Sequence, residues 1–447
     1  MDAPEPTNGT RGLRRVLFSS FAGTSIEWYD FFLFGSAAAL VFPHLFFPGS
    51  DPTTGTLLSF ATYAVAFLAR PLGGVIFGRM GDTVGRKAAL VATLLLTGGG
   101  TFLMGCLPGY DSIGVWAPVC LVILRLVQGL GLGGEWGGAV TLSAEQADAH
   151  GRQRTRGTLA SWVQLGVPVG NLAAVGAFTG ASVLMPDDDF LSWGWRLPFL
   201  ASAVLVVVGL WMRLAVEESP LFRAVERPRA PIAEVLRTQW RPVLLTIGMR
   251  ICSDVSYYVF AVFALSYLAS NLGLPKNWGL YGVILGSVLQ LAVIPGSAAI
   301  SDRVGRRPVY VAGAVWVGVW AFVAWPMIDS GNLVGVLAAL AIGIAGQGVM
   351  YGPMAAFVAE LFDTRLRTSG ASFGYQVAAI FGGAPAPLVA TLLIDRFQTT
   401  FAVTVYVALT AVLACVSALL ARETRDRELA DDFATSDVSK PVAEGMR

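Results

Sequence analysis

The dominant pattern along the chain is a series of long apolar runs separated by short polar segments. Each run has roughly 20 residues or more, the length that an α-helix needs to cross the hydrocarbon core of a bilayer. The runs lack the alternation of barrel strands, so helices are the only spanning form that fits. We expect twelve membrane-spanning helices, at 16–42, 56–77, 88–107, 114–145, 155–182, 195–215, 242–270, 278–299, 308–328, 333–358, 368–393 and 400–420.

The polar segments differ in charge on the two sides of the predicted membrane. Lys and Arg concentrate in every second segment, beginning with the N-terminal one, whereas the segments between them carry mostly Asp. Basic loops stay in the cytoplasm, so this asymmetry predicts a multi-pass protein of the cell inner membrane with both termini and the central loop cytoplasmic. The basic residues are Arg11, Arg14, Arg15, Arg79, Arg86, Lys87, Arg152, Arg154, Arg156, Arg223, Arg227, Arg229, Arg237, Arg303, Arg306, Arg307, Arg365 and Arg367.

The longest interruption of the apolar pattern divides the chain into two halves of six predicted helices. Within it Ile232, Val235, Leu236 and Trp240 recur at helical spacing, which predicts a short helix on the membrane surface. The C-terminal tail is polar and has no heptads, so we expect it to be disordered. The expected organisation is a cytoplasmic segment at 1–15, an N-terminal half at 16–216, a central loop at 217–241, a C-terminal half at 242–421 and a disordered cytoplasmic tail at 422–447.

The amino-acid composition indicates that the protein is embedded in lipid, and it excludes several functions. Hydrophobic residues make up 55% of the chain and charged residues 14%, against about 25% charged residues in soluble proteins. The net charge of +1 gives no basis for a nucleic-acid partner. The four cysteines show no disulfide or metal spacing, and the sequence has no Ser-His-Asp set or phosphate-binding loop. We therefore expect neither an enzyme nor a bound cofactor.

A short loop motif recurs at matching places in the two halves. The stretch GRMGDTVGRK at 78–87 is echoed by SDRVGRR at 301–307, and a second echo pairs acidic and basic residues after the fourth and tenth runs. A parallel repeat of helical halves is a transporter architecture. Asp beside a helix N-terminus and cations beside a C-terminus are favourable, so the motifs are candidates for a cytoplasmic gate. Alternatively they are a topology signal only, which leaves the Asp–Gly spacing unexplained. The gate candidates are Gly78, Asp82, Gly85, Arg86, Lys87, Asp302, Gly305, Arg306, Arg307, Glu145, Arg156, Glu360 and Arg367.

The first loop motif resembles the loop signature of the major facilitator superfamily. The segments IEWYDF (26–31), RPLGG (70–74), RLVQGLGLGGEWGG (125–138), SWGWRLP (192–198) and EESP (217–220) are similar to the metabolite:proton symporter family within it, and the resemblance covers about 15–422. The second loop has Ala298 where the first has Gly78, which weakens the second latch. The resemblance implies inward symport of a small carboxylate-bearing metabolite with H⁺. Members take organic acids such as shikimate, oxoglutarate or citrate, or zwitterionic osmolytes such as proline and betaine.

Carboxylates inside the predicted spans are the candidates for proton coupling, because a charge in hydrocarbon is costly. Glu27 and Asp30 lie on one face of the first run, with Glu27 roughly 17 Å from its cytoplasmic start at helical rise. Two carboxylates this close do not both ionise at low cost, so one is expected to hold a proton. The alternative is that one of them pairs with a cation on another helix. The coupling candidates are Glu27, Asp30, Glu135 and Asp254, with H⁺ as the coupling ion and no cofactor.

Two arginines lie deep in the predicted spans, one in each half. Arg125 either grips a substrate carboxylate or neutralises one of the acidic residues of the N-terminal half. Arg250 and Asp254 are four residues apart, so they form either a self-neutralising pair or an anion anchor. Deep polar residues on other runs are further candidates, with helix–helix hydrogen bonding as the alternative. The substrate-binding candidates are Arg125, Gln128, Trp136, Gln164, Arg250, Tyr257, Gln347, Tyr351 and Gln376.

These features together predict a proton-coupled symporter that works by alternating access and functions as a monomer. The Arg-x-Cys-x-Asp arrangement at 250–254 resembles shikimate-type members, which favours an organic acid. Zwitterionic osmolytes are the alternative, although the tail lacks the coiled coil of osmosensing members. A proton-driven efflux antiporter fits less well, because Asn171 stands where the antiporter glycine motif has Pro. The expected partners are the small-molecule substrate and the lipid bilayer.

Overall fold

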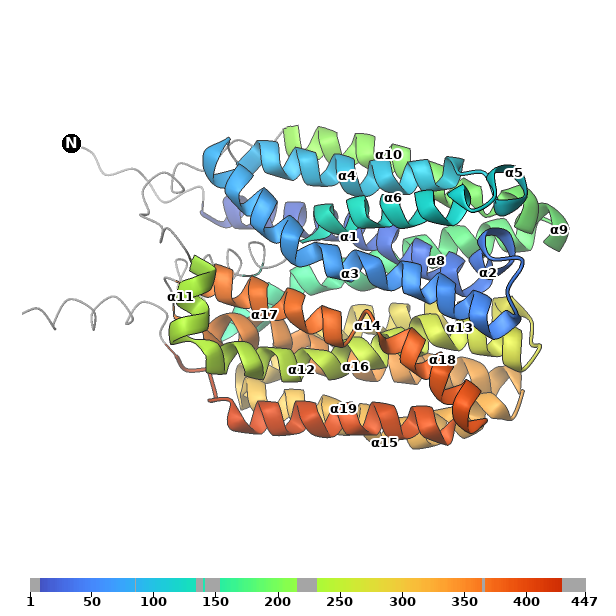
Figure 1. Cartoon of the computed structure of the whole chain (residues 1–447). Helices are drawn as coiled ribbons and strands as arrows, with labels where there is room; N and C mark the ends of the chain where they lie inside the picture. Colours follow the sequence, from blue (N-terminus) through green and yellow to red (C-terminus); the bar gives the residue numbers. More distant parts are fainter. Residues whose placement is uncertain are drawn as a thin grey trace, which may run out of the picture.

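The structure is a computed structural model, and it describes residues 9–84, 86–133, 140, 153–214, 231–363 and 366–427. Side chains are described within these ranges except at 9–20, 78, 81–83, 86–87, 153, 212–214 and 231. Throughout this part of the chain the secondary structure is helical, without a strand. Figure 1 shows two bundles of long helices that lie side by side and run in the same general direction.

The first bundle, the N-terminal half, is built from six rods. Five of them are single helices, and the sixth is bent by 43°. The short helices α2 (Phe42–Phe46) and α5 (Tyr110–Ile113) lie in its loops, and the turn η1 (Gln153–Thr155) leads into its fifth rod. The rods are α1 (Gly9–Leu40), α3 (Pro52–Thr83), α4 (Arg86–Cys106), α6 (Trp116–Leu132), α8 (Arg156–Leu184) and the bent rod α9 (Asp187–Asp189), η2 (Phe190–Gly194) and α10 (Arg196–Leu214).

The second bundle, the C-terminal half, also contains six rods, and α11 (Pro231–Thr238) precedes it. Its first rod continues α12 through two π-helical stretches, and its fifth is broken into two helices. The rods are α12 (Trp240–Tyr258) with η4 (Val259–Phe263), α13 (Ala264–Ser266) and η5 (Tyr267–Asn271), then α14 (Lys276–Val304), α15 (Arg306–Asp329), α16 (Leu333–Leu361), α17 (Arg367–Phe381) with α18 (Ala386–Phe397), and α19 (Phe401–Leu420).

The all-helical fold predicted from the sequence is confirmed, with a rod at each of the twelve predicted positions. Nine of the described helices are long and apolar enough to span a membrane, and the bent rod gives a tenth. Within the described residues α6 has 17 residues and is therefore one of the shorter apolar helices. The assignment of 217–241 as the central loop between the halves stays a prediction. Within this segment the structure has the helix α11, at the place where the sequence predicts a short helix.

Helix ends follow local chemistry that the apolar pattern does not contain. Asp51 accepts a hydrogen bond from the amide of Thr54 at 3.1 Å, which caps α3 several residues before the predicted start. Gly305, at φ +112°, makes the turn between α14 and α15. The predicted span at 368–393 corresponds to one candidate span at Arg367–Phe397, which is interrupted between α17 and α18. Gly382, Gly383 and Pro385 stand at the break, and proline offers no amide hydrogen for helical bonding.

The two halves meet along a few helices. The helix α8 of the N-terminal half packs against α14 and α16, and α3 packs against α17 and α18. Within the N-terminal half, α3 and α6 cross so closely that a Cβ at Gly129 would lie 2.8 Å from the Cα of Ala66. Small residues at such a crossing let helix backbones approach where lipid supplies no hydrophobic drive. This crossing fixes the depth and rotation of the polar side chains on both helices.

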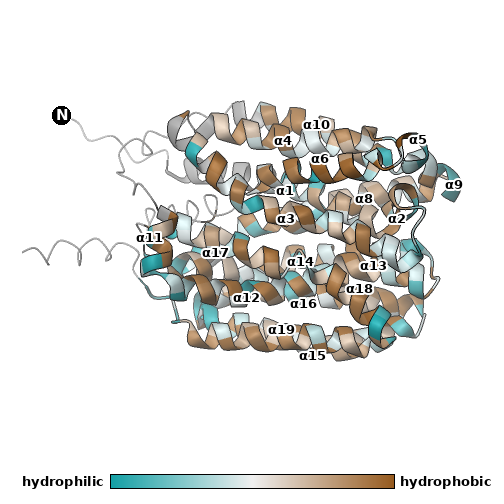
Figure 2. Cartoon of the chain, in the orientation of Figure 1, coloured by the Kyte–Doolittle hydropathy of each residue, from teal (hydrophilic) through white to brown (hydrophobic). Residues whose placement is uncertain are grey.

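Most of the ribbon between the two ends of the bundle has the brown of hydrophobic residues, and teal segments are frequent at the ends (Figure 2). We call the end that carries α11 and the end of α19 the α11 end, and the opposite end, where α9 lies, the α9 end (Figure 1). Large apolar side chains such as Leu72, Trp211 and Val319 are exposed between the two ends. An apolar belt between polar ends is the surface that a spanning protein presents to lipid.

We predict that Gly129→Ala lowers the stability of the protein, because the added methyl group meets the backbone of α3. Overpacking of this kind costs about 1–3 kcal/mol, so the thermal unfolding midpoint in detergent is expected to fall. The matched control is Gly176→Ala, also inside a helix, where a Cβ would meet nothing within 4 Å. Equal midpoints for the two variants would contradict the close crossing.

Candidate functional site

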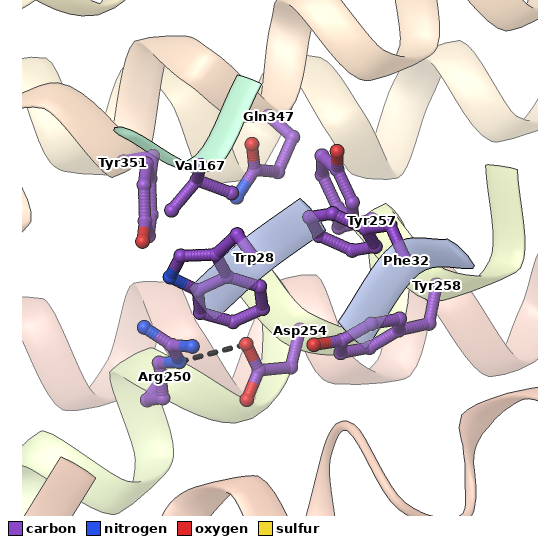
Figure 3. Close-up of a pocket in the computed structure, with 9 residues that line it drawn as sticks. All are labelled: Trp28, Phe32, Val167, Arg250, Asp254, Tyr257, Tyr258, Gln347 and Tyr351. Carbon is purple, nitrogen blue, oxygen red and sulfur yellow. Dashed lines mark ion pairs between the residues drawn. The ribbon is translucent and has the colours of Figure 1, made fainter. Parts of the chain in front are cut away.

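A pocket lies between the two halves, about midway along the rods. Helices α1 and α8 of the N-terminal half form one wall, and α12 and α16 of the C-terminal half form the other. Figure 3 shows Trp28 in the middle of the pocket, between the Arg250–Asp254 pair and Gln347. The lining residues are Trp28, Phe32, Val167, Arg250, Asp254, Tyr257, Tyr258, Gln347 and Tyr351.

The pocket is nearly closed in this conformation. Aromatic rings fill most of the space between the halves, and the volume left open is about that of one water molecule. Trp28 stacks on Phe32 with ring centroids 5.1 Å apart, and Phe32 lies 5.2 Å from Tyr257. A substrate therefore requires these rings to separate before it binds.

Arg250 is the cation of the pocket. Its Nε lies 2.7 Å from Oδ1 of Asp254, and its guanidinium carbon lies 3.5 Å above the ring centre of Tyr375. Both charged side chains are at most 5% exposed. Among the described residues, Nη1 of Arg250 and Oδ2 of Asp254 have no hydrogen-bond partner. The pair therefore keeps one donor and one acceptor for a ligand.

Amide side chains on the C-terminal half hold Gln347 in place. Gln290 donates from Nε2 to Oε1 of Gln347 at 2.7 Å and to the carbonyl of Ile344 at 2.8 Å. Gln347 in turn donates to the hydroxyl of Ser253 at 2.8 Å. A buried amide with both ends engaged has a fixed orientation. Gln347 thus presents a positioned polar group to the pocket.

Among the described residues, four hydrogen bonds join the halves around the pocket. Asn171 of α8 donates to the hydroxyls of Tyr257 at 2.8 Å and Ser287 at 3.0 Å. Gln164 of α8 donates to the carbonyl of Tyr351 at 3.2 Å, and Gln376 of α17 donates to the carbonyl of Gly133 at 3.0 Å. Gln164 and Gln376 are predicted substrate residues. In this conformation they hold the halves together.

A second buried polar cluster lies inside the N-terminal half. Arg125 donates to Oε1 of Gln128, and Gln128 donates to the hydroxyl of Thr101 at 2.8 Å. The fully buried carboxyl group of Asp30 interacts electrostatically with Arg125 and Thr101. Within the described part of the chain, neither Asp30 oxygen nor Nε and Nη2 of Arg125 reaches hydrogen-bond geometry with a partner. The cluster is therefore dry and incompletely satisfied.

Aromatic rings surround the Arg125 guanidinium and separate it from the pocket. Its carbon lies 4.5 Å from the ring centre of Phe31, 4.1 Å from that of Phe34 and 4.9 Å from that of Tyr63. Such cation–π contacts lower the cost of burying the charge. Tyr63 packs against Tyr258, which lines the pocket, with ring centroids 5.9 Å apart. The predicted clamp of one anion between Arg125 and Arg250 is therefore not formed in this conformation.

The predicted site residues fall into several groups. Arg250, Asp254, Tyr257, Gln347 and Tyr351 line the pocket. The predicted residues Asp30, Arg125 and Gln128 form the N-terminal cluster, and Glu27 is buried on α1, 6% exposed, without lining the pocket. Two further predictions lie outside the described residues: Glu135 and Trp136.

Two pocket residues carry no signal that the sequence pattern reveals. Phe32 and Val167 are apolar residues in apolar helices, so nothing distinguishes them from lipid-facing neighbours. Trp28 and Tyr258 have a polar edge and stand beside predicted residues, Trp28 next to Glu27 and Tyr258 next to Tyr257. That adjacency is the only available signal for them.

Several of the residues predicted to form the gate lie together at the α11 end. Asp302 accepts hydrogen bonds from the amides of Gly157 at 2.9 Å and Thr158 at 2.8 Å, and from the Thr158 hydroxyl at 2.6 Å. These amides form the first turn of α8, so the carboxylate of one half caps a helix of the other. A Cβ at Gly157 would lie 2.7 Å from Oδ1 of Asp302. Glycine at this position is what allows the contact.

Buried ion pairs extend the gate. Arg306 pairs with Asp302 and also with Glu360, whose Oε1 lies 3.3 Å from Nη2 of Arg306. Nη1 of Arg156, from the N-terminal half, lies 3.4 Å from the same Oε1. Arg367 is fully buried and donates from Nε to the carbonyl of Ala359 at 3.2 Å. The first residues of the tail that the sequence predicts to be disordered contact these ion pairs. The hydroxyl of Thr424 donates to Oε2 of Glu360 at 2.6 Å. Residues 428–447 lie outside the described residues.

The remaining gate candidates that the structure describes lie at the same end. The carboxylate of Glu423 accepts from the amides of Arg306 at 2.8 Å and Arg307 at 3.1 Å, beside Gly305. Gly78 is part of α3. Gly85 and Glu145 lie outside the described residues, and so do the side chains of Asp82, Arg86 and Lys87. The structure thus places the second loop motif in contact with the N-terminal half.

The α9 end also carries contacts between the halves. Lys276 at the start of α14 pairs with Asp187 of α9, and its ammonium lies 4.5 Å from the ring centre of Phe190. Ser182 of α8 donates to Oδ1 of Asn277 at 3.1 Å. Because both ends are joined and the pocket is nearly full, this conformation is occluded. In the described part of the chain no group of three His, Cys, Asp or Glu residues is placed to hold a metal ion.

Comparison with known proteins gives relatives that match almost the whole chain. A family model described as Major Facilitator Superfamily matches residues 17–373 and 250–443. The inner membrane metabolite transport protein YhjE of Escherichia coli is 41% identical over 427 residues, which cover 93% of this chain and 95% of that protein. The shikimate transporter of Escherichia coli is 40% identical (94% and 98% covered), and its proline/betaine transporter is 32% identical (93% and 85% covered).

Solved structures of distant sequence share the fold. A D-xylose–proton symporter has a TM-score of 0.73 at 18% identity, with 92% of this chain and 98% of that chain covered. The inward open conformation of the Escherichia coli xylose transporter XylE has a TM-score of 0.70 at 16% identity, with 95% and 99% covered. At these identities the likeness concerns the arrangement of helices and carries nothing about the substrate.

We predict that Asp302→Asn loosens the α11 end, because it removes the charge that caps α8. Asparagine caps a helix about as well as aspartate, so the loss is that of the charge at the helix N-terminus, about 0.3–2 kcal/mol. The open population should therefore rise by about 2- to 30-fold. The measurement is the rate at which a thiol reagent labels Gln164→Cys in a background in which the four native cysteines are serine.

The control for this prediction is Asp426→Asn at the same end, where the carboxylate is 79% exposed and pairs with Arg425. It should leave the labelling rate unchanged. A labelling rate in Asp302→Asn equal to that in the control would show that the cap does not hold the halves together.

Proposed function

We propose that this chain, which belongs to the major facilitator superfamily and is a metabolite transporter rather than an enzyme, imports a small organic acid together with a proton. The observation that carries the proposal is the Arg250–Asp254 pair in a pocket between the halves. Guanidinium presents a planar fork that matches a carboxylate, and a buried one binds it strongly. The substrate carboxylate would take the unused Nη1 donor of Arg250.

The relatives support an acid as substrate. The protein named a shikimate transporter is 40% identical over 433 residues, and shikimate carries one carboxylate and several hydroxyl groups. In the pocket the Gln347 amide and the Tyr351 and Tyr257 hydroxyls are placed to meet hydroxyl groups, while Trp28 and Phe32 offer apolar faces. A hydroxylated ring with one carboxylate matches this lining.

Proton coupling is assigned to the cluster around Asp30. With Asp30 ionised, its charge balances Arg125 inside the aromatic rings, and with Asp30 protonated the balance is lost. Protonation therefore changes which arrangement of α1, α4 and α6 is favoured. Since α1 also carries Trp28 and Phe32, the change reaches the pocket directly. Glu27, Glu135 and Asp254 remain predicted coupling residues.

Transport would proceed by alternating opening of the two ends. The distribution of Lys and Arg supports a cytoplasmic α11 end and an external α9 end in the cell inner membrane. The external contacts of Lys276 and Asp187 release first and admit acid and proton. Binding then favours closure of that end and release of the Asp302 cap at the α11 end. The chain is proposed to work as a monomer, because the pocket is built from its own two halves.

A second candidate substrate is a zwitterion such as proline or betaine. The specific observation in its favour is the aromatic lining, since rings of Trp and Tyr recognise quaternary ammonium groups. Asp254 would then face the cation and Arg250 the carboxylate. The protein named a proline/betaine transporter is 32% identical to this chain.

We predict that purified protein in proteoliposomes takes up protons when an organic acid is added, and that Arg250→Ala loses this response. The panel is shikimate, oxoglutarate, citrate, proline and betaine, with external pH as the readout. Loss of a charge-assisted hydrogen bond costs about 1.5–3 kcal/mol, so KM for the acid should rise by about 10- to 150-fold.

The matched control is Arg241→Ala, an exposed arginine at the start of the same helix, which should retain uptake. A proton response to betaine or proline in place of the acids would select the zwitterion. Acid uptake with unchanged KM in Arg250→Ala would refute Arg250 as the anion anchor.

A further inference from the structure

We propose that Arg70 of α3 is a second substrate-binding cation, which contributes a carboxylate contact from the N-terminal half opposite Arg250. The proposal rests on the proposed function, the transport of a carboxylate. It gives the pocket a cation from each half without using Arg125, which remains with Asp30. The position of Arg70 near the end of an apolar run indicates no role in binding. The residues around its guanidinium do indicate one.

The position of Arg70 is fixed by the close crossing of α3 and α6. Gly133 of α6 faces the backbone of Arg70 so closely that a Cβ would lie 2.9 Å from its carbonyl carbon. Pro71 follows inside the helix and removes one amide donor there. The side chain is only 3% exposed. Arg70 is therefore held inside the protein by its backbone and does not reach the surface.

Aromatic rings cradle the Arg70 guanidinium. Its carbon lies 4.4 Å from the ring centre of Phe31, 4.6 Å from that of Phe67 and 5.6 Å from that of Trp28. Phe31 also lies 4.5 Å from the guanidinium carbon of Arg125. One phenyl ring thus contacts two buried cations, which repel each other. An anion near either arginine would stabilise this arrangement.

Among the described residues, no direct ion pair neutralises the charge of Arg70. In the described part of the chain Arg250 pairs with Asp254 and Asp30 acts on Arg125 electrostatically, whereas Arg70 forms no ion pair with a carboxylate. Its Nε is buried and has no hydrogen-bond partner among these residues. Rings alone do not supply the hydrogen-bond acceptors that a guanidinium needs. An incoming carboxylate would supply them.

Two pocket residues connect Arg70 to the substrate space. Trp28 lines the pocket and lies over Arg70, and Tyr258 lines the pocket beside Phe31 and Phe67, at 6.2 and 5.6 Å between ring centroids. Arg70 also acts electrostatically on Asp254 across this space. In the occluded conformation Trp28 covers Arg70. Rotation of that indole during opening would expose the guanidinium to the pocket.

The proposal fixes the charge that the site accepts. Arg70 and Arg250 contribute two positive charges and Asp254 one negative charge, so these three side chains together carry a net +1 toward the substrate. A site of this charge is neutralised by a substrate with one carboxylate. A dicarboxylate would leave an excess negative charge in a buried space, which is costly. The site therefore selects monocarboxylates.

The test compares an acid with its uncharged ester in reconstituted protein. The acid is the panel member that the wild type transports, beginning with shikimate, and the competitor is its methyl ester. In Arg70→Gln, KM for the acid should rise by about 10- to 100-fold, while inhibition by the ester should change little. Arg70→Lys should lie between, because it keeps the charge and loses the fork. Arg241→Gln serves as the exposed control.

The possible results separate the role of Arg70 from the proposed function as a whole. The proposal is supported if Arg70→Gln, with an unchanged unfolding midpoint, no longer prefers the acid over its ester. Equal weakening of acid and ester, or an unchanged KM, overturns it and leaves Arg70 a structural residue. If the wild type transports none of the acids, the proposed function itself fails, whatever Arg70 does.

Discussion

Burial of positive charge in an apolar bundle is the constraint on which the rest of this structure depends. An arginine inside the membrane needs a carboxylate, hydrogen-bond acceptors or ring faces, because water is absent. Arg125 has Asp30, Gln128 and three rings, and Arg250 has Asp254 and the ring of Tyr375. Because each set draws on different helices, satisfying the charges also positions the helices.

The same constraint operates where the two halves meet. The carboxylate of Asp302 caps α8 across the interface, and Glu360 is shared by Arg156 and Arg306 from opposite halves. These contacts are strong only while they are dry. Opening of the α11 end admits water, which weakens them together. The proposed alternating access would therefore involve two distinct states of this end, closed and dry or open and wet.

The fold could be predicted from the sequence, but only part of the site could. Long apolar runs require helices, and the spacing of Arg250 and Asp254 at four residues predicts their contact. Two roles were open for Arg125, substrate binding or neutralisation of an acidic residue. In this conformation it interacts electrostatically with Asp30, and Phe31 and Tyr63 lie between it and the pocket. The rotation of a membrane helix is hard to predict, because its lipid face and its protein face are both apolar. Only tertiary packing decides it.

We propose that two buried pairs divide the steps of transport, with Asp30 and Arg125 in proton coupling and Arg250 and Asp254 in substrate binding. Asp30→Asn in proteoliposomes tests it most directly. Two rates would be compared, accumulation of acid driven by a pH gradient and exchange of labelled for unlabelled acid without a gradient. The account predicts that accumulation is lost and exchange is retained. Accumulation at the wild-type level in Asp30→Asn would contradict it.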